Sequence, residues 1–243
     1  MPTRRPLFLP IIATAVFALV CARLGIWQLN RLAQRQAWNA HFTARLAAAT
    51  VPIAALPTDT AAGHYLRVSA TGTFDFPAQV ALAARSSQGS PGVHLLTPMR
   101  LADGSFAIVN RGWVYSPDAM TVDPARWRER EGETVTVTGY AETWSGRETK
   151  RLPPGQRVVR ELDSAAVSRL VGAPIRPYYL VQTSDSAPAT AHPVRLGEPV
   201  LDDGSHRSYA IQWFSFALIA LFGGAMLVRD ELLRRRASAG TAG

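Results

Sequence analysis

Two apolar stretches, one near each end of the chain, decide the fold. Residues 7–26 read LFLPIIATAVFALVCARLGI, at the centre of an apolar run that begins at residue 6, and residues 211–228 read IQWFSFALIALFGGAMLV. Roughly 20 residues rising about 1.5 Å each are long enough to cross a hydrocarbon core of about 30 Å. The one charged side chain, Arg23, lies near the end of the first stretch, where it can extend to the interface. Each stretch therefore predicts a transmembrane helix.

A cleaved signal peptide, a twin-arginine signal and a lipoprotein leader are the alternatives to an uncleaved first helix. The stretch is longer than the apolar part of a signal peptide, and no small-residue cleavage site precedes a polar segment. Residues 3–5 resemble a twin-arginine signal, but Pro6 and the early start of the apolar run weaken that interpretation. Val20 precedes Cys21 at a position where lipoprotein processing needs a small residue. An uncleaved membrane anchor is the interpretation that we adopt.

The charged residues predict lipid contact and an orientation. The chain of 243 residues has 26 Lys and Arg against 18 Asp and Glu, a net charge of +8. Arginines gather at residues 4–5 and 229–236, whereas Arg31, Arg35 and Arg207 flank the opposite ends of the stretches. The terminal clusters favour both termini in the cytoplasm, although the difference between the two sides is modest. No basic cluster interleaved with aromatic residues is present, so we expect membrane lipid and no nucleic acid as a partner.

These stretches divide the chain into four parts. Residues 1–27 form a tail and the first transmembrane helix, and residues 28–205 form an extracytoplasmic domain that begins with a helical extension. Residues 206–228 form the second transmembrane helix, and residues 229–243 form a basic cytoplasmic tail. Because Cys21 is the one cysteine, an intramolecular disulfide and a metal site made of paired cysteines are both excluded.

Between the helices, the apolar residues alternate with a period of two, which is typical of half-buried strands. Residues 31–46 continue as a polar helix, and residues 164–171 form a short helix with Asp163 or Ser164 as its cap. This pattern predicts a β-rich (α+β) domain built as an antiparallel sheet or small open barrel. The expected strands cover residues 64–75, 79–84, 93–101, 105–115, 134–144, 158–162, 176–183 and 193–200, with a loop over residues 183–191.

The clearest local prediction is the turn at Asp103-Gly104. It joins the third and fourth expected strands, and Asp-Gly can adopt the two positive φ angles of a type I′ hairpin turn.

Enzyme motifs are not apparent, since no metalloprotease helix, nucleophile elbow, phosphate-binding glycine loop or metal-spaced histidine pair is present. His206 is the histidine that draws attention. If a helix begins near Ser205, then His206, Tyr209 and Trp213 lie near one face of it, with Arg207 and the helix N-terminus close by. A haem needs such an axial ligand, apolar bed and cationic partner. The alternative is an ordinary interfacial belt of aromatic residues that includes a histidine.

Two further pairs of residues leave alternatives open. Gln28 and Gln212 each lie beside a tryptophan at the outer end of a helix, where they either bond across the two helices or face the headgroups separately. Gly223 and Gly224 either let another helix approach closely or tolerate a bend.

Three blocks of sequence together resemble one family. Residues 24–32 read LGIWQLNRL and resemble an LGxWQxxR signature, which places Gly25, Trp27, Gln28 and Arg31 in the motif. Residues 84–87 (ARSS), Gly92, residues 97–98 (TP), Gly104 and residues 109–114 (VNRGWV) are similar to a second stretch, with Met99 in place of a leucine. Residues 206–214 read HRSYAIQWF and resemble NHLxYAxxWF, with Gly204, Ser205 and Arg207 as departures. All three are similar to the Surfeit-locus family of cytochrome c oxidase assembly factors.

The resemblance implies a protein of the bacterial inner membrane, or its mitochondrial counterpart, with its central domain on the outer side, which in a bacterium is the periplasm. It implies a role in building respiratory complex IV by receiving or presenting haem a, with His206 as the iron ligand. The implied partners are the haem-bearing oxidase subunit and haem a synthase. For Arg111, Gly112 and Trp113 we expect mainly a structural role, with the two glycines of the block, Gly104 and Gly112, at turn or bulge positions and the Trp113 indole N–H paired to backbone.

Three functional hypotheses follow. The first is a non-enzymatic haem chaperone in which His206 ligates iron, Tyr209 and Trp213 pack the macrocycle, and Arg207 pairs with a propionate. The second is a scaffold that stabilises an oxidase assembly intermediate without haem. The third, which no motif supports, is a membrane-anchored enzyme.

Overall fold

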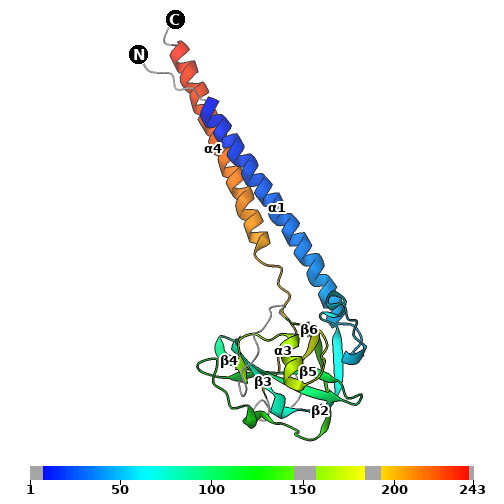
Figure 1. Ribbon diagram of the computed structural model, residues 1–243. Helices are drawn as coiled ribbons and strands as arrows, with labels where there is room; N and C mark the ends of the chain where they lie inside the picture. Colours follow the sequence, from blue (N-terminus) through cyan, green and yellow to red (C-terminus); the bar gives the residue numbers. More distant parts are fainter. Residues whose placement is uncertain (1–7, 145–156, 184–192, 241–243) are drawn as a thin grey trace. The chain divides into compact units, whose positions relative to one another are not determined.

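The computed structural model describes residues 8–144, 157–183 and 193–240, without the side chains of residues 238–240 (Figure 1). The predicted arginine cluster at residues 4–5 and residues 184–191 of the predicted loop lie outside this range. The chain forms two compact units, which are described separately. The helix unit consists of Met1–His41 and Leu201–Gly243, and the β-domain consists of Phe42–Val200.

The helix unit contains most of α1 (Phe8–Leu46) and all of α4 (His206–Gly240). Both helices are long and apolar enough to cross a membrane by length and composition. Only 17% and 11% of their most apolar windows are buried, so neither is the core helix of a soluble domain. The predicted polar extension at residues 31–46 is confirmed as the continuation of α1, and the predicted helix start near Ser205 is confirmed by α4.

The two helices run antiparallel and lie side by side, and the C-terminal end of α4 extends beyond the start of α1 (Figure 1). Small side chains form the buried seam between them. Ala18, Cys21 and Gly25 are buried on α1, and Ala210 and Ala217 are buried on α4. Their spacing of three, four and seven residues keeps one stripe of each helix facing the other.

The described residues of the β-domain form one mixed sheet of eight strands, in the order β1-β2-β6-β8-β5-β4-β3-β7. The sequence predicted an antiparallel sheet or a small open barrel. The antiparallel alternative is correct only in part, because the pairs β1–β2, β3–β7 and β5–β8 are parallel. The sheet curls, so that β2 also pairs with β4 over three residue pairs. The strands are β1 (Val51–Pro52), β2 (Arg67–Phe74), β3 (Val80–Ser87), β4 (Ser90–Leu101), β5 (Phe106–Tyr115), β6 (Thr134–Thr143), β7 (Val158–Val159) and β8 (Tyr178–Gln182).

The predicted strand at residues 193–200 is wrong. In this segment Val194 forms an isolated bridge with Trp113, and no strand follows. Pro193, directly before the bridge, and Pro199, near the end of the segment, have no N–H to donate to a ladder. The predicted strand at residues 158–162 shortens to the two residues of β7 for lack of further partners.

The hairpin between β4 and β5 forms as predicted, but its turn is not type I′. Gly104 has φ +80°, whereas Asp103 is not among the residues with positive φ. The Asp103 carboxylate instead accepts hydrogen bonds from the backbone N–H (2.9 Å) and the hydroxyl (2.6 Å) of Ser105. This side-chain bonding stabilises a longer loop in place of the two-residue turn.

Both faces of the sheet are buried. Val109 and Leu180 belong to one core cluster, while Ile108 belongs to a second cluster on the other face. The second cluster is covered by α3 (Ser164–Val171), which Asp163 caps by accepting from the backbone N–H of Ala166 at 2.7 Å. The remaining short helices are η1 (Ile53–Ala55), α2 (Thr60–Gly63), η2 (Phe76–Ala78) and η3 (Pro124–Trp127).

Candidate functional site

His206 is the first residue of α4, and a hydrogen bond from α1 holds its ring. His206 Nδ1 lies 2.8 Å from Gln28 Oε1. An amide oxygen can only accept, so Nδ1 carries the proton and Nε2 keeps its lone pair. Within the described part of the chain, Nε2 has no hydrogen-bond partner. The imidazole is therefore fixed in one tautomer with the other nitrogen open.

The outcome for the two glutamines differs from both alternatives considered for them. Gln28 does bond across the two helices, but its partner is His206 rather than Gln212. Gln212 is exposed on α4.

The segment before α4 is also tied to α1 within the helix unit. The Asp203 carboxylate accepts from the side-chain amides of Asn39 (2.9 Å) and Gln36 (3.0 Å), and Arg35 Nε donates to the Asp202 carbonyl oxygen at 3.0 Å. Gly204 has φ +73°, a conformation that glycine and asparagine tolerate best. These contacts fix where α4 begins and hence where His206 lies.

Close packing of α1 against α4 supports the same geometry. A Cβ at Gly25 would lie 2.8 Å from the Phe214 ring, so only glycine permits this approach. A Cβ at Gly224 would lie 3.0 Å from Thr14 Oγ1, whereas one at Gly223 would contact nothing within 4 Å. The close-approach interpretation is therefore confirmed for Gly224, which lies against α1, whereas no helix of the described chain lies against Gly223.

The other predicted site residues on α4 differ in how close they lie to the side of the helix that carries His206. Trp213 is half-buried on the same stripe of α4 and its ring centroid lies 5.9 Å from that of Phe216, edge to face. Tyr209 is 48% exposed beside this stripe. Arg207 is exposed and rotated by about 100° from His206, so the structure does not bring it onto the histidine face.

Trp27 and Arg31, from the first motif, lie on the exposed side of α1. Trp27 is 48% exposed, and the Arg31 guanidinium lies 6.0 Å from the centre of its ring. This arrangement is a surface cation–π contact and does not include His206.

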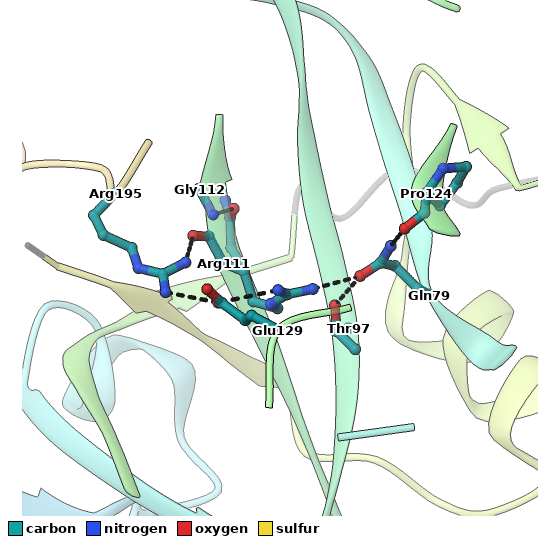
Figure 2. A network of polar contacts seen from close by, with 8 residues as sticks. Gln79, Thr97, Arg111, Gly112, Pro124, Glu129 and Arg195 are labelled. Carbon is teal, nitrogen blue, oxygen red and sulfur yellow. Dashed lines mark hydrogen bonds and ion pairs between the residues drawn. The ribbon is translucent and has the colours of Figure 1, made fainter. Parts of the chain in front are cut away.

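The β-domain contains a second polar site, centred on Arg111 (Figure 2). Its side chain is completely buried, and Nη1 donates to Gln79 Oε1 at 2.8 Å while Nη2 lies 3.0 Å from Glu129 Oε1. Arg195 reinforces the site by donating to the Arg111 carbonyl oxygen and to Glu129, both at 2.7 Å. The Phe76 ring covers the guanidinium at 4.9 Å. Burial lowers the pKa of Arg111, and Glu129 opposes that shift.

A bulge in β5 positions Arg111. Leu95 pairs with Gly112 while Leu96 pairs with Asn110, so Arg111 is the extra residue. Gly112 has φ +127°, and a Cβ there would lie 2.3 Å from the Val194 carbonyl oxygen. The predicted bulge role of Gly112 is confirmed.

Trp113 departs from its predicted pairing. The ring is half-buried, but its indole N–H has no hydrogen-bond partner in the described part of the chain. The nitrogen lies against Gly92, where a Cβ would come within 2.3 Å of it.

Sequence reasoning missed four polar residues of the β-domain. Gln79, Glu129 and Arg195 come from segments far apart in sequence, and no local pattern connects them. His94 on β4 was also missed. Burial and the positive charge of Arg85 lower its pKa to about 4, so this histidine is neutral at neutral pH.

Comparison with known proteins identifies the family. A sequence model of the SURF1 family matches residues 15–218 of the 243. The chain belongs to the SURF1 family. An uncharacterized SURF1-like protein of Mycobacterium bovis is 28% identical over 243 residues, which cover 97% of this chain and 88% of the relative.

More distant relatives match with similar coverage. A SURF1-like protein of Monosiga brevicollis is 27% identical over 82% of this chain and 79% of its own length, and one of Rickettsia bellii is 24% identical over 82% of each. SURF1 family members are generally cytochrome oxidase assembly factors. The matched range includes Gln28, Arg111 and His206, so both polar sites belong to the part shared with the family.

Proposed function

We propose that this protein is a non-enzymatic assembly factor that receives haem a and presents it to the haem-bearing subunit of cytochrome c oxidase. The observation that carries the proposal is the open Nε2 of His206, held in place by Gln28 at the end of an apolar helix pair. Haem a synthase is the proposed donor. Haem a is the cargo here and supplies an iron that a neutral imidazole can ligate.

The Gln28 contact suits an iron ligand. Histidines that bind metals almost always donate their second ring N–H to an acceptor, which fixes the ring and raises its basicity. In this chain that acceptor is already in place and Nε2 has no described partner. A histidine of an ordinary interfacial belt has no need for this orienting bond.

Side chains around His206 fit a flat apolar cargo. Trp213 and Tyr209 would supply the apolar surface, since one is half-buried on the histidine stripe and the other is exposed beside it. Arg207 would pair with a propionate at the outer rim, where its exposed guanidinium has no described ion-pair partner.

We also propose that α1 and α4 anchor the protein in the bacterial inner membrane, with both termini cytoplasmic and the β-domain in the periplasm. The outward-facing residues Phe8, Leu218 and Phe222 are 68–74% exposed, and they would lose that exposure in lipid. Arg229 and residues 234–236, at the end of α4, fit the excess of positive charge on the cytoplasmic side.

The test is the haem a content of the full chain, purified in mild detergent from a host that makes haem a. The absorption spectrum of the wild type should show bound haem a, and His206→Ala should remove it without changing membrane insertion. His41→Ala is the matched control, because His41 is an exposed histidine on α1, and it should keep its haem. Full retention of haem by His206→Ala would overturn the ligand assignment.

A haem-independent scaffold is the second candidate, and the open face at Gly223 favours it. Nothing lies within 4 Å of a Cβ at Gly223, and the neighbouring Phe222 is 71% exposed, so this side of α4 has room for a helix of an oxidase subunit. The scaffold predicts that an oxidase subunit co-purifies with the wild type and with His206→Ala alike, whereas the haem chaperone predicts a loss of haem in that variant.

A further inference from the structure

A pocket in the β-domain has a composition that suits a small ligand. Its volume is about 320 Å³, within the lower part of the range of small-molecule sites. Leu82 and Leu162 form a buried apolar floor, Trp144 and Tyr179 form an aromatic wall, and Arg85 with Arg160 lie at the rim. None of these residues takes part in the Arg111 network or in the helix unit.

The guanidinium of Arg85 is held at the pocket with its donors almost unused. It reaches only the carbonyl oxygens of Ala84 (3.5 Å) and Arg160 (3.4 Å), both at the limit of hydrogen bonding. No carboxylate of the described residues lies within ion-pair distance of it. The guanidinium of Arg160, on the other side of the rim, has Met120 Sδ as its described contact at 3.8 Å.

The backbone of β3 is distorted where it presents Arg85. The pairing of β3 with β4 shifts register between Leu82 and Arg85, and Ala84 has φ +56°, which is unusual for a residue with a side chain. Bulges of this kind change the direction of a side chain and are frequent beside binding sites.

The acidic residues of the pocket are already engaged. Glu142 Oε1 accepts from His64 Nε2 and from the Thr143 backbone N–H, both at 2.8 Å. Glu161 is exposed and has an interaction partner of its own. The two arginines and two glutamates of the pocket sum to zero charge, so net charge does not select the ligand. The guanidinium N–H groups that have no strong acceptor decide which ligand fits.

Besides the guanidinium groups of Arg85 and Arg160, the Tyr179 hydroxyl is a third hydrogen-bond donor at the pocket. Its ring centroid lies 4.8 Å from that of Trp144, and its hydroxyl has no hydrogen-bond partner in the described part of the chain. Burial, followed by the charge of Glu142, raises the pKa of Tyr179, so the hydroxyl stays protonated. Guanidinium groups and a protonated phenol donate, and a carboxylate can only accept.

We infer that this pocket binds a carboxylate carried on an aromatic or similarly flat apolar body, with Arg85 and Tyr179 donating to the carboxylate and Trp144 against the body. This binding site belongs to the β-domain, shares no residue with the His206 site and does not depend on the haem proposal. The same chemistry is present in a free organic acid and in the C-terminal residue of a polypeptide.

The experiment uses the full chain in lipid nanodiscs and saturation-transfer NMR titrations with water-soluble probes, with empty nanodiscs as the blank. The probes are 3-phenylpropionate, its neutral amide, 3-phenylpropylamine and the peptide acetyl-Gly-Gly-Phe with a free C-terminus. We expect 3-phenylpropionate to bind at least tenfold more tightly than the amide and the amine. Arg85→Gln should raise the Kd for 3-phenylpropionate at least tenfold, and Arg85→Lys should raise it less.

Controls separate a binding defect from a folding defect. Arg126→Gln alters an exposed arginine outside the pocket and should leave the Kd unchanged, and the melting temperature of Arg85→Gln should match that of the wild type. Tighter binding of the amine, an unchanged Kd in Arg85→Gln, or no binding of either carboxylate probe would each overturn the inference. If the peptide binds at least as tightly as 3-phenylpropionate the natural ligand is a polypeptide C-terminus, and if only the free acid binds it is a small molecule.

Discussion

Arg111 in the β-domain and His206 in the helix unit are both polar residues within sequence motifs, yet their surroundings differ. Arg111 is completely buried, and its guanidinium contacts Gln79, Glu129 and two phenylalanine rings. His206 is half-buried and makes one side-chain hydrogen bond, to Gln28. Arg111 is enclosed by its partners, and its one nitrogen without a described contact, Nε, is itself buried, whereas His206 keeps a ligating atom open on a half-buried ring.

The difference teaches how to separate structural from functional polar residues in one chain. A buried charge is tolerated when protein groups compensate it, and the compensated group then has little capacity for a ligand. A side chain that is held by a hydrogen bond at one atom and has a second polar atom without a partner can still bind a ligand through that second atom. By this criterion Arg111 stabilises the fold, while His206, and Arg85 at its pocket, are available to ligands.

The largest effect is expected from Arg111→Met. The substitution leaves the half-buried Glu129 with Arg195 as its remaining partner and Gln79 without its guanidinium donor, and breaking a buried ion pair costs up to about 3–5 kcal/mol of unfolding free energy. Urea unfolding of the full chain in detergent, followed by tryptophan fluorescence, measures it. Arg128→Met is the matched control, because the Arg128–Glu131 pair is exposed and should contribute under about 1 kcal/mol. Equal effects of the two variants would contradict a structural role for Arg111.

The next effect is a loss of stability in mild acid through His94. The folded-state pKa of about 4 lies below the unfolded value of 6.5, so the unfolded chain takes up a proton first as the pH falls. Stability from this group is complete above pH 6.5 and is lost towards pH 4, with a total of about 3 kcal/mol.

The measurement for His94 is the unfolding free energy at pH 7 and pH 4.5 in wild type and His94→Gln. The difference between the two pH values should be smaller in the variant. Asp103 and Asp118 have pKa values lowered by their hydrogen bonds, so their contributions are lost only below the ordinary pKa of an aspartate and do not overlap this window. An identical pH dependence in both proteins would show that His94 is not buried as a neutral base.

Gln28→Leu tests the other half of the comparison. Without the acceptor for Nδ1 the imidazole can rotate and change tautomer, and losses of this kind lower metal affinity by about 10–100-fold. Haem titration of the purified protein measures the affinity, and selective ¹⁵N labelling of histidine reports the His206 tautomer without haem. Gln212→Leu, at an exposed glutamine, should change neither. The unfolding free energy of the β-domain should be the same in Gln28→Leu and Gln212→Leu as in the wild type, whereas Arg111→Met lowers it.

The parts of the fold that sequence predicted correctly depend on neighbouring residues. The two helices follow from the lengths of their apolar stretches, and α3 begins where Asp163 can cap it. The Asp103-Gly104 hairpin also formed, although with a different turn. The wrong strand at residues 193–200 had the right alternation, but Pro193 and Pro199 have no N–H to donate to a ladder.

The candidate site was predicted in part. His206 and Trp213 were identified, but the partner of His206 lies 178 residues away in sequence, and only the packing of α1 on α4 brings it near. The partners of Arg111 likewise come from separate loops and strands. A signal did exist for Gln28, an amide directly after an apolar stretch, but sequence alone gave it two equivalent interpretations.

The smallest effect concerns the helix seam that supports His206. An alanine at Gly224 would place its Cβ 3.0 Å from Thr14 Oγ1 and push the helices apart slightly, whereas an alanine at Gly223 meets open space. Cys21, fully buried between the helices, reports such opening through its rate of reaction with N-ethylmaleimide in detergent. Gly224→Ala should raise this rate roughly twofold, equivalent to about 0.5 kcal/mol, and Gly223→Ala should leave it unchanged. If both substitutions raise the rate equally, the seam does not run through Gly224, and the packing that holds Gln28 against His206 must come from the Gly25–Phe214 contact alone.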